Sequence, residues 1–184
     1  MSAAPPLHVL EIVAAADHGA IARLADELER AGARVSVLCG DARDTPLAHR
    51  AAGRTVLQAA LADDPSWATI RLAASWSVSE NVDVFHAHGA AAHLVAVLAG
   101  ALCEVPCVAT IPGDEIPMLD LEAHRLGDRA HLCVEGAQAF HHARALGVAP
   151  ARLHHAALGR EPARVYDVLR ACAQAQDALR NRRG

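Results

Sequence analysis

Aromatic residues are scarce in this sequence. Two phenylalanines, two tryptophans and one tyrosine make up 3% of its 184 residues, although 53% of the residues are hydrophobic. The core must therefore consist mainly of alanine, leucine and valine side chains, whose small size suits helices that pack on a sheet. A chain of this length holds one sizeable core and is too short for two full α/β domains. We therefore expect one domain over residues 1–184.

The sequence also lacks an excess of positive charge, because its formal net charge is −4 at pH 7. Such a balance gives no broad basic surface of the kind that binds nucleic acid or anionic membranes. Arginines do cluster at the C-terminal end, at Arg180, Arg182 and Arg183, but a short charged tail is normally just solvated. We expect neither a nucleic-acid partner nor binding to a membrane surface.

No apolar run is long enough to span a bilayer, which takes about 20 residues. The longest run, from Ala90 to Cys103, is interrupted by His93. The N-terminus, Met-Ser-Ala-Ala-Pro-Pro, has neither the basic nor the apolar segment of a signal peptide. The sequence has five cysteines, which are Cys39, Cys103, Cys107, Cys133 and Cys172. Their odd number and irregular spacing argue against a disulfide framework and for buried thiols in a reducing cytosol. These absences predict a cytoplasmic protein.

The sequence does contain a strict alternation of apolar strands and amphipathic helices. Apolar runs predict strands at 7–16, 34–38, 54–57, 82–85, 105–111, 130–134 and 152–156. Helical spacing predicts helices at 20–31, 67–79, 90–102, 136–146 and 162–180, with a short helix or turn at 120–126. The segment 44–50 contains Pro46 and is expected to be a loop. Such alternation predicts a single Rossmann-like, doubly wound parallel sheet over 7–158. A disordered tail at 1–6 would precede it.

The most informative segment runs from Val82 to Ala92, where a buried strand ends in His86, His88 and Gly89. Ligands bind beyond the carboxyl ends of strands in open parallel sheets. The two histidines are two positions apart on a strand, so they point to the same face. They could bind a metal with His93 or a cysteine as a third ligand. Alternatively, His86 is packed and hydrogen-bonded while His88 lines the cleft. We favour the second interpretation and expect no metal site.

Two further segments carry polar groups at expected strand ends. Asp114 and Glu115 could serve in acid–base chemistry, but a solvated loop is the simpler interpretation. The turn 17–19 precedes a helix whose N-terminal N–H groups could bind an anion, although Asp17 is expected to cap that helix instead. Cys103 and Cys107 have the spacing of some zinc sites, but no second pair follows at a suitable interval, so we expect both to be buried.

The terminal helix 162–180 has a stripe of apolar residues. The stripe consists of Val165, Val168, Leu169, Cys172, Ala175 and Leu179. It could pack on the domain itself, cover a face where a second domain would dock, or form a dimer contact.

Several short motifs occur along the chain in a recognisable order. They are Leu-Ala-x-x-Leu at 24–28, Gly-x-x-Val-x-Val at 32–37, Asp-Val-Phe-His-x-His-Gly at 83–89, Pro-x-Val-x-Thr at 106–110 and Gly-Val at 147–148 followed by Arg-Leu at 152–153. In order and spacing they resemble the N-terminal half of GT-B glycosyltransferases of family four, the retaining group 1 enzymes. The resemblance covers nearly the whole chain and implies half of a GT-B fold with an added C-terminal helix.

The sequence departs from the family pattern in several places. The paired glycines of the first loop are reduced to Gly19, and Thr-x-His-Gly is replaced by Thr110-Ile111-Pro112-Gly113. Proline has no N–H donor, so that polar contact is lost. Glu135 stands where the family has serine, and 158–161 replaces Asn-Gly-Val-Asp. The second domain of these enzymes, which holds most of the nucleotide-sugar contacts, has no counterpart in this sequence.

The resemblance implies a glycosyltransferase domain that binds the acceptor and is not active as an isolated chain. Substrate-binding residues would be His88, Gly89, Gly19, Gly113 and Thr110. No cofactor is expected, but a nucleotide sugar would be the co-substrate. The partners would be a sugar-like acceptor and either a GT-B C-terminal-type subunit or a second copy in a homodimer. Two alternatives remain: a degenerate half that serves as a binding or scaffolding module, and a Rossmann-like protein that binds a small molecule or nucleotide.

Overall fold

A computed structural model describes residues 6–14, 18–40, 44–61, 65–126, 129–156 and 161–183. Its centre is a seven-stranded sheet in the order β3-β2-β1-β4-β5-β6-β7, in which all neighbours are parallel. The strands are β1 (His8–Val13), β2 (Arg34–Cys39), β3 (Thr55–Gln58), β4 (Val84–His88), β5 (Cys107–Ile111), β6 (Ala130–Val134) and β7 (Leu153–His155). The strand order reverses between β1 and β4, which makes this junction the topological switch point. The predicted fold class is confirmed.

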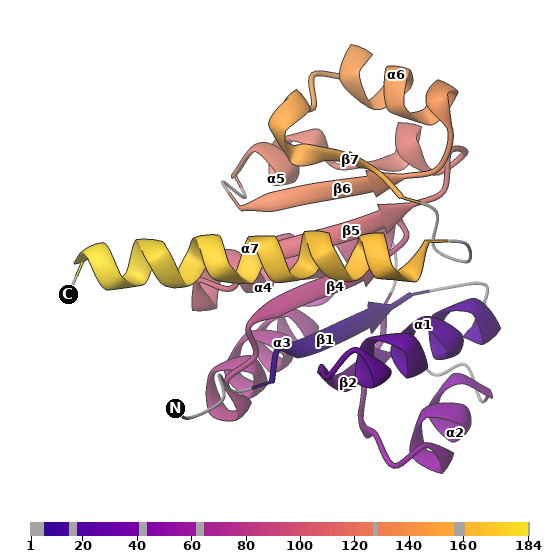
Figure 1. Ribbon diagram of the computed structural model, residues 1–184, viewed down its shortest axis with the longest axis vertical. Helices are drawn as coiled ribbons and strands as arrows, with labels where there is room; N and C mark the ends of the chain where they lie inside the picture. The colour runs from indigo at the N-terminus through magenta and orange to yellow at the C-terminus, as the bar shows by residue number, and fades with distance from the viewer. Residues whose placement is uncertain are drawn as a thin grey trace.

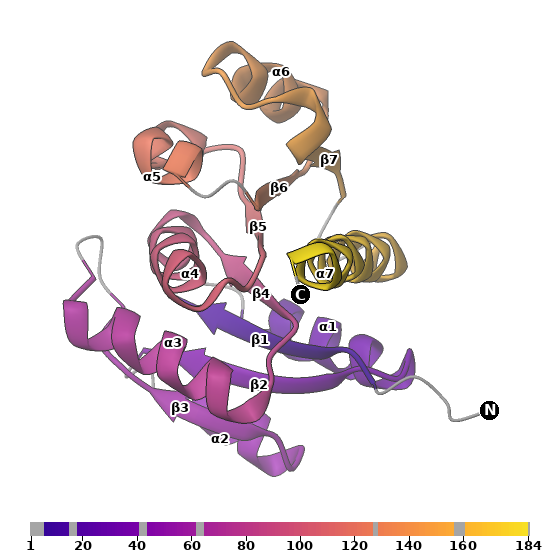
Figure 2. The ribbon, with the colours of Figure 1, turned by 90° about the vertical axis from the view of Figure 1, so that its left-hand side faces the viewer.

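Helices cover both faces of the sheet. They are α1 (His18–Arg30), α2 (Asp44–Ala51), α3 (Trp67–Glu80), α4 (Ala90–Cys103), α5 (Leu121–Leu126), α6 (Ala137–Ala145) and α7 (Pro162–Arg183), with 3-10 turns η1 (Ile116–Met118) and η2 (Pro150–Arg152). Figure 1 shows α7 lying across the middle of the sheet. Figure 2 shows the sheet between α1 and α7 on one side and α3, α4 and α5 on the other. The central strands are therefore buried on both faces.

Burial on both faces explains why the central strands read as continuous apolar runs. Leu10 and Phe85 belong to the core cluster on the side of α3 and α4, whereas Val9 and Val84 pack in a second cluster with residues of α1 and α7. Neighbouring positions on each strand thus contribute to opposite layers of the core. A polar residue in these strands must find its partners inside the protein.

Two local expectations were wrong. The segment expected to be a loop forms helix α2, in which Pro46 is the third residue. Proline is tolerated in a first helical turn because the N–H groups there have no partner within the helix. Gly19, expected in a turn, is the second residue of α1. Asp17, the expected cap of that helix, and residues 1–5 of the expected tail lie outside the described residues.

Helix α7 packs on its own domain. Val165, Leu169, Cys172 and Ala173 are buried in the same cluster as residues of α1 and of the sheet. The first of the three interpretations of its apolar stripe is thus confirmed for Val165, Leu169 and Cys172, whereas Ala175 and Leu179 are exposed. The helix continues to Arg183, three residues beyond the predicted end at 180. Among the described residues, no helix has both the length and the apolar character needed to cross a membrane.

The cysteines Cys103 and Cys107 are free thiols, as expected. Cys107 is fully buried in β5, and burial raises the pKa of its thiol far above the ordinary range. Cys103 lies at the end of α4, where its Sγ donates to the Ala99 carbonyl at 3.1 Å. The expected burial is therefore confirmed for Cys107, whereas Cys103 is only partly buried.

Candidate functional site

Four polar side chains meet near the carboxyl ends of β1, β4 and β5. The register pairs Glu11 with His86 and His88 with Thr110. His86 Nδ1 lies 3.2 Å from Glu11 Oε1, and His86 Nε2 lies 2.9 Å from Thr110 Oγ1. His88 Nε2 also contacts the Glu11 carboxylate, at Oε2. Glu11 and His86 are 0% exposed, and the exposed fractions of His88 and Thr110 are 4% and 7%. The expectation that His86 is packed and hydrogen-bonded is confirmed.

The charges of this cluster are set by burial and by its own hydrogen bonds. Burial alone would raise the pKa of Glu11, but the two imidazoles outweigh it and hold that pKa well below its usual range. Burial, helped by His86, lowers the pKa of His88, although Glu11 opposes the shift. Glu11 is therefore an ionised acceptor, and His88 is a neutral imidazole that donates through Nε2. Among the described residues, His88 Nδ1 then has no hydrogen-bond partner.

The same cluster is the only group of described residues whose donor atoms could together hold a metal ion. Glu11, His86 and His88 each contribute one donor atom, and these three atoms lie within 4.8 Å of one another. A pair of histidines with a carboxylate is a ligand set that suits zinc. The expected third ligands are not at this place. His93, in α4, instead pairs with His124 of α5, with 3.2 Å between their ring nitrogens.

Glu11 was missed from the sequence, although a signal was present. It is the single acidic residue of β1, an otherwise mostly apolar strand whose two faces are both covered. A charged side chain at such a position is rarely buried without a partner. A search for histidines or basic residues at equivalent places on neighbouring strands would have led to His86.

A cleft of about 490 Å³ opens at the start of α4. His88 and Gly89 come from the end of β4, and the opposite side is formed by the chain between β5 and α5. Its described lining residues are Ala14, His88, Gly89, Ala90, Ala91, Leu94, Glu115, Met118 and Asp120. The volume lies within the range of about 300–1,000 Å³ typical of small-molecule sites. The cleft is at the switch point, where ligands of open α/β sheets bind.

Glu115 forms one wall of the cleft and caps α4. Its Oε2 accepts a hydrogen bond of 2.8 Å from the Ala90 N–H, at the helix N-terminus. Gly89, the N-cap, has φ 88 and ψ 170 and offers no side-chain cap of its own. A Cβ at Gly89 would lie 2.8 Å from Glu115 Oε2. The interpretation of Glu115 as part of a solvated loop was therefore wrong, whereas its neighbour Asp114 is exposed as expected.

Residues 20–164 match the family described as Glycosyltransferase Family 4. The chain belongs to this family. No match to the chain is found among curated proteins. The predicted resemblance, which rested on motif order and the histidine strand end, is thus confirmed for most of the chain.

Solved structures similar to this Family 4 domain agree with it in fold. Acinetobacter baumannii MurG has a TM-score of 0.57 at 14% identity, over 72% of this chain and 43% of MurG. A putative UDP-N-acetylglucosamine 2-epimerase from Listeria monocytogenes has a TM-score of 0.58 at 16% identity, over 80% of this chain and 43% of the epimerase. A Rickettsia africae glycosyltransferase has a TM-score of 0.59 at 13% identity, over 80% of this chain and 42% of the transferase. The chain thus spans less than half the length of each of these proteins, in keeping with one half of a GT-B fold.

The five residues predicted to bind substrate do not all lie together in the Family 4 domain. His88 and Gly89 line the cleft at α4. Thr110 lies behind it, with its hydroxyl on His86. Gly113 lines a second cleft of about 540 Å³ beside the start of α6. Gly19 is exposed on the first turn of α1.

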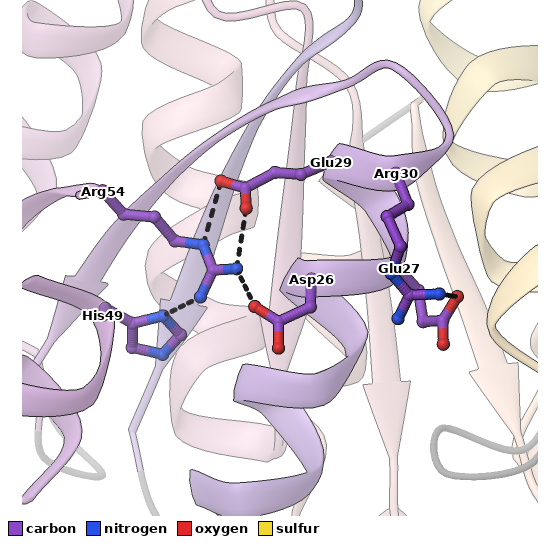
Figure 3. Close-up of polar contacts among 6 residues, drawn as sticks. All are labelled: Asp26, Glu27, Glu29, Arg30, His49 and Arg54. Carbon is purple, nitrogen blue, oxygen red and sulfur yellow. Dashed lines mark hydrogen bonds and ion pairs between the residues drawn. The ribbon is translucent and has the colours of Figure 1, made fainter. Parts of the chain in front are cut away.

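A second polar network, in which Arg54 and His49 are buried and the carboxylates are partly exposed, lies between α1, α2 and the start of β3 (Figure 3). The Arg54 side chain is 2% exposed. It donates to both oxygens of Glu29, at 3.0 and 2.8 Å, to Asp26, and to His49 Nδ1 at 3.1 Å. Since guanidinium only donates, His49 accepts through Nδ1 and carries its proton on Nε2. That nitrogen is buried and unpartnered among the described residues.

This network interacts electrostatically with the cluster of Glu11, His86, His88 and Thr110, which we call the strand-end cluster. Burial lowers the pKa of His49, and Glu11 is among the charges that oppose the shift. His49 in turn is one of the groups that lower the pKa of His88. Sequence reasoning found neither Arg54 nor His49. Their contacts join α1, α2 and the residue just before β3, and Arg54 precedes its strand instead of following it.

Proposed function

We propose that this Family 4 domain is the acceptor-binding half of a glycosyltransferase and acts with a separate chain that binds the nucleotide-sugar donor. The observation that carries the proposal is a cleft at the switch point, lined by His88 and Gly89, in a chain that belongs to this family. The match covers 43% of MurG, and in this proposal the donor-binding half is supplied by a partner. A second copy of the chain is the other candidate for that partner.

His88 is the residue we assign to direct contact with the acceptor. Its Nε2 carries the proton and donates it to Glu11, so Nδ1 has no proton and can accept a hydrogen bond. A hydroxyl of a sugar-like acceptor would satisfy this buried nitrogen, which otherwise has no partner among the described residues. Leaving such a group unpaired costs about 1–3 kcal/mol. Binding a hydroxyl there would therefore be favourable.

The other predicted substrate-binding residues take different parts in the proposal. Gly89 lets the acceptor approach the backbone at the start of α4. Thr110 acts through His86, because its hydroxyl holds the imidazole that contacts Glu11. Gly19 and Gly113 lie at the same carboxyl edge of the sheet and would border the space between the two halves.

The test has two stages. An affinity-tagged chain is first used to isolate a partner with a GT-B donor-binding half, and nucleotide release from nucleotide sugars is then measured with and without it. Turnover is expected only when both chains are present. His88→Ala should lower kcat/KM by about tenfold or more, whereas His141→Ala, which removes an exposed histidine of α6, should not. Full turnover by the His88 variant would reject the site assignment.

One observation favours a second candidate, a non-catalytic binding module. Pro112 stands directly after β5, where the resemblance implies a histidine, and it offers no N–H donor to a ligand. Under this alternative no partner supports turnover, and nucleotide sugars do not raise the melting temperature. A ligand at 100 times its Kd should stabilise the protein by about 2.7 kcal/mol, so a saturable rise in melting temperature would count against the module.

A further inference from the structure

The described lining of the cleft at α4 contains acidic but no basic side chains. Of its described lining residues, Glu115 and Asp120 carry negative charge, and none is lysine or arginine. Neither carboxylate forms an ion pair with another described residue. His88 does not offset this charge, because burial favours its neutral form. A ligand in the cleft therefore meets two negative charges.

The helix N-terminus at the cleft already holds a carboxylate of the protein itself. The first N–H groups of a helix and its dipole usually attract phosphate or carboxylate. Here the Glu115 carboxylate already accepts from the Ala90 N–H at 2.8 Å. An anionic ligand would have to displace Glu115 or remain beside it, and either costs free energy. The arrangement therefore disfavours acceptors that carry phosphate or carboxylate groups.

Both carboxylates are held in place by backbone groups. Asp120 Oδ1 accepts from the Ala123 N–H at 2.9 Å, at the start of α5. Glu115 is fixed in the same way by α4. Each bond uses one oxygen of its carboxylate, and the other oxygen retains capacity to accept. The two acceptors are thus pre-positioned, which reduces the entropy lost when a donor group binds to them.

The remaining wall of the cleft is apolar. It includes Leu94 of α4 and Met118 of η1, and Met118 is 65% exposed. An apolar wall facing fixed hydrogen-bond acceptors suits a saturated ring with a C–H face and polar substituents. The unpartnered Nδ1 of His88, a residue that also lines the cleft, adds an acceptor for a hydroxyl.

We infer that the acceptor bound in this cleft is a polyhydroxylated ring that carries a protonated amine, with the ammonium group on Glu115 and Asp120. The inference rests on the proposed function, because it names the class of acceptor for the same cleft. An ammonium group brings three donors and one positive charge. It would therefore offset negative charge that a neutral hydroxyl would leave unbalanced.

The test compares methyl glucoside with two probes that each differ from it at one carbon: methyl glucosaminide, with an amine in place of the 2-hydroxyl, and methyl glucuronide, with a carboxylate at C6. Their binding to the full chain is measured by ligand-observed NMR titration in a buffer below the pKa of the amine. The glucosaminide should bind about tenfold tighter than the glucoside, the effect of one close charge pair near a protein surface. The glucuronide should bind most weakly. The preference for the amine should decrease as salt is added.

Two variants make the test specific. Glu115→Gln keeps a carbonyl oxygen that can accept from the Ala90 N–H, so it should fold normally while losing most of the preference for the amine. Asp114→Asn removes the same charge one residue away, from a side chain that lines the second cleft rather than this one, and should keep the preference.

The outcomes separate the inference from the proposed function. Equal binding of the three probes, or tightest binding of the glucuronide, would overturn the inference and leave an acceptor cleft in place. If none of the probes bound, the amine-bearing acceptor would also be rejected. The proposed function would then still be decided by the turnover assay with the partner chain, which does not depend on these probes.

Discussion

The Nδ1 atom of His86 lies 3.0 Å from Oε2 of Glu11, and both side chains are completely buried. The two residues are 75 positions apart in the sequence, yet they are direct partners in the register of β1 and β4. Glu11 also accepts from His88. One carboxylate therefore satisfies two imidazoles at the switch point of the sheet.

Removing this carboxylate should destabilise the protein. Glu11→Ala would leave both His86 and His88 without their buried acceptor, and each unsatisfied group costs about 1–3 kcal/mol. We expect the free energy of unfolding, measured by urea denaturation, to fall by several kcal/mol. Glu122→Ala on α5 removes a carboxylate whose side chain is 81% exposed and should change it by about 0.5 kcal/mol or less. Similar losses for the two variants would contradict the role of Glu11.

Acid should destabilise the protein through buried histidines. Burial lowers the pKa of His93 to about 3 and that of His124 to about 4. Because these values lie below the unfolded value of 6.5, the unfolded state binds more protons in this range. The stabilisation is complete above pH 6.5 and is lost as the pH falls toward 4 and then 3.

Urea denaturation at a series of pH values would measure this dependence. In a double variant with His93→Leu and His124→Leu, the decline in unfolding free energy between pH 6.5 and 4 should be smaller. His141→Leu, at an exposed position of α6, should leave the slope unchanged. An unaltered slope in the double variant would show that other groups carry the acid sensitivity.

The sequence predicts the sheet well because central parallel strands are buried on both faces and must be apolar. The same rule obscured Glu11, whose significance depends on histidines that only the β1–β4 register brings near it. Glu115 was similarly misjudged, since its partner Ala90 lies 25 residues earlier. Helix α2 was missed because Pro46 was interpreted as a breaker, although a first helical turn tolerates proline.

We expect the strand-end cluster to function without a bound metal. A metal ion held by Glu11, His86 and His88 would compete with the contacts that both imidazoles already make to the Glu11 carboxylate. Both imidazoles already have an acceptor, so the fold does not depend on an ion at this place. The purified protein should contain less than one equivalent of zinc by elemental analysis, and EDTA should leave its melting temperature unchanged. Stoichiometric zinc, together with a lower melting temperature in EDTA, would reverse this assignment.

Gly89 is required by its backbone conformation and by its nearness to Glu115. At φ 88 and ψ 170 a side chain costs about 1–3 kcal/mol in strain. A Cβ 2.8 Å from Glu115 Oε2 would also disturb the cap of α4, which is worth about 0.5–2 kcal/mol. Gly89→Ala should therefore lower the unfolding free energy by about 3 kcal/mol.

Gly53 provides a matched control for this substitution. It also has positive φ, at 77, but a Cβ there would meet no atom within 4 Å. Gly53→Ala should therefore show only the backbone strain, about 1–2 kcal/mol. The contact with Glu115 can then be isolated by a double-mutant cycle: Gly89→Ala should cost less in a Glu115→Ala background than in the wild type. Equal costs in the two backgrounds would mean that the carboxylate does not constrain Gly89, and that the helix cap and the cleft wall are independent features.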